Sequence, residues 1–335
     1  MTETGLRALT QRVNCFPLQH LNLSETHLNT VGLRVIGELT TLTHLRVRGC
    51  ALKRDDLRLL CKLTHLHTLV VADNAAIDDD SLLVLKDLKQ LQILDVAGTA
   101  ISSIGILNLV DCKDTLVSLS LARCQLVTGN TERLLSLGKL EFLDLGDTPL
   151  FDLAISHCSN MKVLAELRLP RRLNITDAGM AYLRNLTSLQ TLDLSDYVRL
   201  TDAGLSLLAS LVELRSLALN NTHLTDAGLR NLIPSLTKLQ SLSLDRTRIS
   251  SEALHVLTHC PFLSSLSIAQ NELIDDKAAN CLRALSESLE SLNIANTKIT
   301  ARGHHHTLPH THTHTHSLHI LTLSLGLEAL PSGGT

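Results

Sequence analysis

The densest metal-binding chemistry of the sequence lies close to the C-terminus. Seven histidines occur between residues 304 and 316, namely His304, His305, His306, His310, His312, His314 and His316. The last four alternate with other residues, so in an extended chain their imidazoles would share one face and could hold zinc, nickel or copper. The favoured alternative is a low-complexity insertion that binds metal only adventitiously. We expect no cofactor elsewhere in the chain.

Charged residues of alternating sign recur at a nearly constant spacing in the middle of the chain. Asp144, Arg168 and Asp193 are 24 and 25 residues apart. If the chain repeats with this period, the three side chains lie on neighbouring strands and form a charge row. The candidate residues of a docking patch for a protein partner are Phe142, Asp144, Asp147, Arg168, Arg171 and Asp193, with Asp95 and Arg46 further along the row. The alternative is that the row only neutralises itself, because exposed ion pairs are individually weak.

Two basic clusters allow an anion-binding interpretation. Arg168, Arg171 and Arg172 follow an acidic stretch at 141–147 and could bind an acidic peptide or a phosphate group. A smaller cluster, His-Leu-Arg-Val-Arg, stands at 44–48. In both places a solvated face is the favoured interpretation.

Other candidate sites are weaker. Asp73, Asn74 and the aspartates at 78–80 suggest calcium, but an EF-hand loop needs a central glycine and a distal glutamate, and neither stands at the required place. Asp79 and Asp80 are better explained as first-turn caps of a helix that continues through Ser81. His65 and His67 are better explained as separate surface histidines than as a chelating pair.

The sequence has none of the common catalytic motifs. It contains no phosphate-binding glycine loop, no Gly-x-Ser-x-Gly, no His-Glu-x-x-His and no paired zinc cysteines, so we expect a protein that is not an enzyme. The eight cysteines are spread along the chain without a Cys-x-x-Cys pair and are expected to be reduced, buried thiols. Cys112, Cys260 and Cys281 in particular stand at positions expected to face the core.

The elements that must position these residues follow from an internal repeat. Aligned on Leu-x-x-Leu-x-(Leu/Val/Ile)-x-x-(Thr/Asn/Cys), the chain repeats twelve times, starting at residues 18, 42, 66, 91, 116, 140, 164, 189, 214, 239, 263 and 289. The alternating Leu-x-Leu predicts a short strand with its leucines on one side. Outward-facing side chains then occupy the third, fifth and seventh pattern positions, with Phe142 and Tyr197 as the aromatic residues of this face.

Each predicted strand is followed by a segment with helical spacing. In LTDAGLRNLIPSLTK (224–238), Thr225 is placed as the N-cap and Asp226 lies in the first turn, where it complements the helix dipole. The same Thr-Asp-Ala-Gly stands at 176–179 and 201–204. One strand and helix cannot bury its leucines alone, so stacked repeats must share one continuous core.

Composition agrees with such a core and excludes several classes of protein. Leucine accounts for 77 of 335 residues, about 23%, whereas aromatic residues amount to 2%. No apolar run approaches the roughly 18 residues that a membrane span needs, and no signal peptide is recognisable, so the cytosol or the nucleus is expected. The net charge of −3 makes nucleic acid and membranes unlikely partners, and a small-molecule substrate is not expected.

At residues 18–299 the chain resembles the leucine-rich repeat family. Cys50 and Cys124 at the ninth pattern position, together with ISHCSNMKVL (155–164) and THCPFLSSL (258–266), resemble the cysteine-containing subclass found in F-box proteins. The resemblance implies an α/β fold, a right-handed horseshoe-shaped solenoid with parallel strands on the concave face and helices on the convex face. It also implies a non-catalytic scaffold that binds a protein partner, or the substrate-recognition subunit of an F-box-type ubiquitin ligase. Metal binding by the histidine tract is the third hypothesis.

The pattern divides the chain into four parts. Residues 1–17 are expected to form the helical half of a partial repeat, and residues 18–303 the twelve-repeat solenoid. Residues 304–317 are the histidine-rich insertion, and residues 318–335 hold a degenerate thirteenth repeat, with Leu318, Leu321 and Leu323 in strand spacing, and a disordered end.

Overall fold

The computed structural model describes residues 17–129, 131–169 and 175–300. Twelve parallel strands form one sheet in chain order. They are β1 (His20–Asn22), β2 (His44–Arg46), β3 (Thr68–Val70), β4 (Ile93–Asp95), β5 (Ser118–Ser120), β6 (Phe142–Asp144), β7 (Glu166–Arg168), β8 (Thr191–Asp193), β9 (Ser216–Ala218), β10 (Ser241–Ser243), β11 (Ser265–Ser267) and β12 (Ser291–Asn293). Each strand begins two residues after a start of the predicted pattern, so the predicted strands are confirmed.

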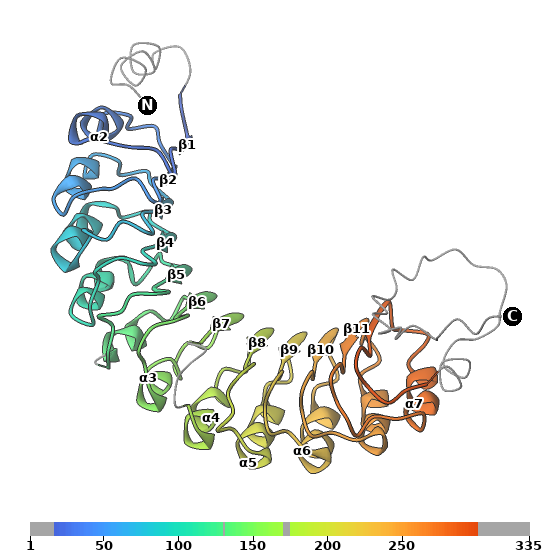
Figure 1. The fold of residues 1–335 in the computed structure, drawn as a ribbon. Coiled ribbons are helices and arrows are strands. Elements are labelled where there is room, and N and C mark those ends of the chain that lie inside the picture. The colour runs from blue at the N-terminus through green and yellow to red at the C-terminus, as the bar shows by residue number, and fades with distance from the viewer. Residues whose placement is uncertain (1–16, 130, 170–174, 301–335) are drawn as a thin grey trace, which may run out of the picture.

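The sheet lines the inner side of a curved arc, and the helical segments lie along its outer side (Figure 1). The α-helices are α2 (Thr30–Gly37), α3 (Asp152–Ser156), α4 (Asp177–Leu183), α5 (Asp202–Ser206), α6 (Asp226–Leu232) and α7 (Ala278–Ala284). The 3₁₀-helices are η1 (Asp56–Leu60), η2 (Asp79–Asp87), η3 (Gly105–Cys112), η4 (Glu132–Ser136), η5 (Leu207–Ser210), η6 (Ile233–Ser235) and η7 (Ser251–His259).

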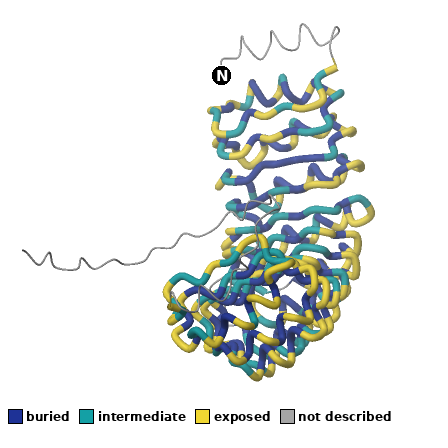
Figure 2. Tube along the Cα trace, turned by 90° about the vertical axis from the view of Figure 1, so that its right-hand side faces the viewer, coloured by how far each residue is buried: buried dark blue, intermediate teal, exposed yellow. Residues whose placement is uncertain are grey.

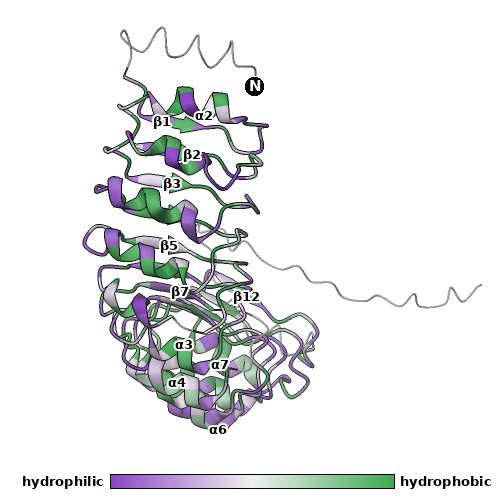
Figure 3. Cartoon of the chain, turned by 90° about the vertical axis from the view of Figure 1, so that its left-hand side faces the viewer, coloured by the Kyte–Doolittle hydropathy of each residue, from purple (hydrophilic) through white to green (hydrophobic). Residues whose placement is uncertain are grey.

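The outer layer therefore differs in part from the expected α-helix in every repeat. Between β2 and β6 the described segments are all 3₁₀-helices. A 3₁₀-helix rises about 2.0 Å per residue against 1.5 Å in an α-helix, so it extends further along the outer side for the same number of residues. The hydropathy of this layer alternates between apolar and polar along each segment, as expected where one side packs on the core (Figure 3).

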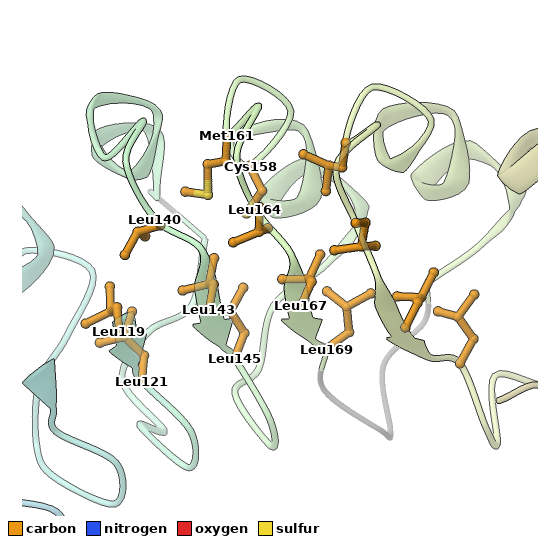
Figure 4. Close-up of a cluster of buried hydrophobic side chains, with 14 of the residues drawn as sticks. Leu119, Leu121, Leu140, Leu143, Leu145, Cys158, Met161, Leu164, Leu167 and Leu169 are labelled. Atoms are coloured by element: carbon orange, nitrogen blue, oxygen red, sulfur yellow. The ribbon is translucent and has the colours of Figure 1, made fainter. Parts of the chain in front are cut away.

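The core is a continuous column of leucines between the sheet and the outer layer. Leu143 and Leu167, the central residues of β6 and β7, are 0% and 1% exposed. The leucines that precede and follow these two strands, Leu140, Leu145, Leu164 and Leu169, are at most 5% exposed (Figure 4). Buried residues run through the inside of each repeat, and exposed residues lie where the chain reverses direction between the sheet and the outer layer (Figure 2). Burial of each leucine contributes about 1.5–3 kcal/mol, which accounts for the composition of the sequence.

The threonine of the Thr-Asp-Ala-Gly phrase caps its own helix. The side-chain oxygens of Thr176, Thr201 and Thr225 accept hydrogen bonds from the backbone N–H two residues further on. The prediction for Thr225 is thus confirmed. Asp226 lies in the first turn of α6 as expected.

The aspartate of the same phrase also joins neighbouring repeats. Asp226 accepts hydrogen bonds from the backbone N–H of Ser250 at 2.7 Å and from its hydroxyl at 2.6 Å. Asp177 makes the same pair of bonds with Thr201. The glycine of the phrase makes room for this carboxylate, because a Cβ placed on Gly204 would lie 2.1 Å from Asp177 Oδ1. The phrase recurs because each repeat must accept the carboxylate of the repeat before it.

The acidic run at 78–80 has a structural role. Asp78, rather than Asp79 or Asp80, is the N-cap of η2, and Ser81 completes a capping box with it. Asp79 accepts hydrogen bonds from the backbone N–H and the hydroxyl of Ser102 in the next repeat. These contacts support the expectation of a helix start.

Candidate docking surface on the concave sheet

The predicted charge row exists along the concave face. Asp144 on β6 lies directly opposite Arg168 on β7, and Asp193 on β8 follows on the next strand. The Nη1 atom of Arg168 lies 3.7 Å from Oδ2 of Asp144. The register of the pattern therefore places oppositely charged side chains side by side.

Arg168 has closer contacts than its predicted ion pair with Asp144. Its Nε donates a hydrogen bond of 2.8 Å to Oε1 of Glu166, two residues earlier on the same strand. Its guanidinium carbon lies over the ring of Phe142, 5.2 Å from the ring centroid, which is cation–π geometry. The side chain is still 58% exposed. Phe142, Glu166 and Asp144 thus hold one arginine in place with most of its donors facing the concave space.

A groove of about 560 Å³ lies on this part of the concave face. The residues that line it come from β6–β9 and from the turns after β5 and β6: Ala122, Arg123, Asp144, Gly146, Asp147, Glu166, Leu167, Arg168, Leu169, Thr191, Leu192, Asp193, Ser216 and Ala218. We call it the central groove. It brings together Asp144, Asp147, Arg168 and Asp193 of the predicted patch.

The aspartates of the row also stabilise the ends of their strands. Oδ1 of Asp144 accepts a hydrogen bond of 2.8 Å from the backbone N–H of Gly146, and Oδ1 of Asp193 accepts one of 2.9 Å from Ser195. Asp95 makes the same contact with Ala97. An aspartate at the fifth position therefore has one oxygen engaged in the turn after its strand.

A network of ion pairs borders the central groove on the side of the N-terminal repeats. Arg123 Nη2 lies 2.6 Å from Oδ1 of Asp73, whose Oδ2 lies 2.7 Å from Nη2 of Arg48. Asp73 reaches Arg123 across Gly98, where a Cβ would lie 2.4 Å from Asp73 Oδ1. Asp73 is thus engaged by two arginines, which explains its position better than a calcium site.

Two members of the predicted patch lie apart from the others. Arg46 is on β2 and Asp95 is on β4, and neither lines the central groove. With neighbouring strands about 4.8 Å apart, Arg46 is roughly 19 Å from the strand of Asp144. The repeat spacing predicts that all fifth-position residues form one row, but it does not predict which part of that row borders a groove.

One further expectation for this face is wrong. Tyr197 is 2% exposed and belongs to the hydrophobic core, so Phe142 is the aromatic contribution of the groove region. Val70 lies on the concave side, as its fifth position predicts, and it is only 7% exposed because it packs with Ala72 and Ala97 in a small apolar cluster there.

Several predicted features lie outside the described residues. They include the predicted partial first repeat in 1–16 and the predicted thirteenth repeat in 301–335. They also include Arg171, Arg172 and the histidine tract with His304, His305, His306, His310, His312, His314 and His316. Within the described residues, no group of three or more histidine, cysteine or acidic side chains is arranged to hold a metal ion. The same residues include no helix that is long and apolar enough to cross a bilayer.

The sequence interpretation did not identify Glu166 and Arg123 as members of this surface. Glu166 stands at the third position of its repeat, two residues before Arg168. Residues two apart on a strand lie on the same face, so the sequence already indicated that Glu166 could contact Arg168. Arg123 stands at the turn after β5 with a φ of 58°. No sequence signal reports its contact with Asp73, which is 50 residues away.

The described cysteines are free thiols with unequal exposure. Burial raises the pKa of Cys158 to about 12 and the pKa values of Cys112 and Cys260 to about 11. Cys61 is exposed and Cys281 is only partly buried, contrary to the expectation of buried thiols throughout. Cys61 follows η1 on the outer layer, where no neighbouring repeat covers it.

No protein-family model matches the chain, and no curated protein matches it. Solved structures do match. An internalin of Listeria monocytogenes has 21% identity and a TM-score of 0.65, with 91% of this chain and 92% of that chain covered. A structure of the yeast Rad7 and Elc1 complex has 20% identity and a TM-score of 0.64, with 90% and 86% covered. A structure of the mouse RP105/MD-1 complex has 22% identity and a TM-score of 0.51, with 85% and 43% covered.

These likenesses establish the fold. The chain is an α/β leucine-rich repeat solenoid, as the sequence resemblance implies.

Proposed function

We propose that this leucine-rich repeat chain is a non-catalytic scaffold that binds a protein partner in the central groove. The observation that carries the proposal is Arg168, which is oriented by Phe142 and Glu166 and yet exposed to the concave space. Arginine is enriched among the residues that dominate binding energy, and a pre-oriented guanidinium loses little side-chain entropy on binding.

The groove offers charged groups of both signs to a ligand. Asp144, Asp147, Glu166 and Asp193 line it together with Arg123 and Arg168. Phe142 is not a lining residue and lies partly buried beneath Arg168. Two of the solved structures with this fold contain partner proteins, Elc1 and MD-1. A protein ligand that presents charged and hydrogen-bonding side chains suits this surface.

The test is affinity capture followed by quantitative mass spectrometry, with wild-type protein and the double variant Phe142→Ala/Asp144→Arg. We expect at least one partner to be lost from the variant while its thermal unfolding remains cooperative. The matched control is Ile104→Ser/Leu107→Ser on the outer segment η3, where the two side chains are 68% and 47% exposed. A partner that is lost from the η3 variant and kept by the groove variant would place binding on the convex face and contradict the proposal.

A second candidate function is substrate recognition in an F-box-type ubiquitin ligase. The sequence resemblance to the cysteine-containing subclass favours it, and the yeast Rad7 and Elc1 complex has a similar fold. Recovery of a Skp-like adaptor or a cullin in the same capture experiment would support this candidate. Their absence from the wild-type sample, with other partners present, would remove it.

A further inference from the structure

A second chemically distinct surface lies on the first three strands of the concave sheet. His20 on β1 is directly opposite His44 on β2, and His44 is opposite Thr68 on β3, the residue after His67. The rings of His20 and His44 stack with centroids 4.0 Å apart and 11° between their planes. The ring of His67 lies edge-on to that of His44 at 6.4 Å. Three imidazoles from three repeats are therefore neighbours.

Arg46 extends this group along β2. It is two residues after His44, so both side chains lie on the same face of the strand. Arg46 is exposed and has no ion pair among the described residues, whereas Arg48 is engaged by Glu25 and Asp73. We call His20, His44, His67 and Arg46 the His/Arg patch.

Among the residues that the structure describes, no acidic side chain forms an ion pair with the patch. The charged groups that face His44 are His20 on β1, Arg46 on its own strand and His67 beside β3, and all three disfavour its cationic form. Partial burial is the largest cause that holds the pKa of His44 below its ordinary value, and repulsion from these three groups adds to it. The nearest acidic residue of the same row, Asp95, is two strands away, roughly 10 Å.

The hydrogen bonding of His44 fixes which nitrogen can meet a ligand. Its Nδ1 lies 2.8 Å from the hydroxyl oxygen of Thr43, and that hydroxyl donates its single hydrogen to the carbonyl of Gln19. Thr43 must then accept from Nδ1–H, which leaves Nε2 to bind the proton that charges the ring. Protonation thus adds a new donor on the other side of the imidazole from Thr43.

We propose that the His/Arg patch binds an acidic peptide segment of a protein partner, and that protonation of its histidines strengthens this binding. The cationic groups are spread over three strands, a width of roughly 10 Å, which suits several carboxylates better than a single phosphate. Their strand backbone groups are engaged in the sheet and form no nest for a phosphate. Stacked parallel rings do not converge on one point, as metal ligands would.

The proposal is independent of the central groove, because β4 and β5 separate the two surfaces. Carboxylates beside the patch would reverse the repulsion that disfavours imidazolium. Peptide binding would therefore be coupled to proton uptake, and affinity would rise as pH falls through the histidine pKa range.

The test uses the full chain and a fluorescent deca-glutamate peptide in an anisotropy titration at low salt. We expect binding about tenfold tighter near pH 5.5 than near pH 7.5. Arg46→Gln should weaken binding at both values, and His20→Gln/His44→Gln should reduce the effect of pH to about twofold or less. His65→Gln is the matched control, since this exposed histidine is two residues before His67 and is not part of the described ring contacts among His20, His44 and His67.

A second measurement keeps the test valid if a variant is destabilised. The pKa of His44 in wild-type protein, followed by the NMR shift of its ring protons, should rise when the peptide is added. Three results would overturn the proposal: equal affinity at both pH values, an equal loss of affinity in His65→Gln, or an unchanged His44 titration. Displacement of the peptide by an equal concentration of inorganic phosphate would also overturn it, in favour of a simple anion site.

Discussion

The carboxylate of Asp152 joins two repeats by accepting two hydrogen bonds from Thr176, one of 3.0 Å from its backbone N–H and one of 2.7 Å from its hydroxyl. Asp152 is the first residue of α3 and Thr176 is the N-cap of α4, so this contact connects two consecutive helices independently of the chain between them. Equivalent pairs occur between Asp177 and Thr201 and between Asp202 and Thr225.

Asp152→Ala should lower the free energy of unfolding by about 1–3 kcal/mol, because it removes both hydrogen bonds to a charged acceptor and leaves the Thr176 N–H without this partner. Urea denaturation followed by circular dichroism measures the change. Asp111→Ala is the matched control, since Asp111 is exposed on the outer layer and makes no hydrogen bond or ion pair with described residues. Equal destabilisation by both variants would show that the Asp152–Thr176 contact contributes nothing specific.

Gly179→Ala should be destabilising only while Asp152 is present. A Cβ on Gly179 would lie 2.4 Å from Oδ1 of Asp152, whereas alanine favours a helix over glycine by roughly 0.8–1 kcal/mol. In the Asp152→Ala background the same substitution should become neutral or stabilising. A double-mutant cycle on the free energy of unfolding measures this coupling, and additive effects would contradict it.

A charge exchange between Asp144 and Arg168 separates the two interpretations of the charge row. Asp144→Arg/Arg168→Asp keeps opposite charges opposite each other on β6 and β7 but removes the contacts of Arg168 with Glu166 and Phe142. If the row binds a partner, the exchanged protein should fail to capture that partner, as the single variant Arg168→Asp does. If the row only neutralises itself, the exchange should retain capture, although stability falls by the hydrogen bond that Asp144 accepts from the backbone N–H of Gly146. The single variant Arg168→Asp, in which the residue at 168 has the same charge as Asp144, serves as the reference for the loss of the ion pair.

Thiol reactivity should follow burial. At about pH 8 iodoacetamide should modify Cys61 first among the described cysteines, because it is exposed. Cys281 should react more slowly, because partial burial raises the pKa of its thiol and only thiolates react. Burial raises the pKa of Cys158 to about 12, so its thiolate fraction is very small and its modification should require unfolding. Peptide mapping by mass spectrometry reads out each site. Labelling of Cys158 as fast as Cys61 in native protein would contradict the buried position.

The repeat and its register could be derived from the sequence. Leucines at a period of two, recurring every 24–26 residues, specify strands that must stack to bury one face, and this fixes which residues lie opposite each other. Asp144 and Arg168 were for this reason correctly placed as neighbours. The N-cap role of Thr225 also depends on a few adjacent residues and was predictable.

Contacts between side chains of different repeats depended on the tertiary structure. Leucine burial specifies the strand register, but it leaves open how the long polar side chains orient on the exposed face, where many rotamers have similar energies. The contact of Arg168 with Phe142, the reach of Asp73 across Gly98 to Arg123, and the stacking of His20 on His44 are of this kind. The sequence by itself determined the scaffold, whereas the curvature and the side-chain packing of the folded chain decided where the concave face is hollow and where its cations gather.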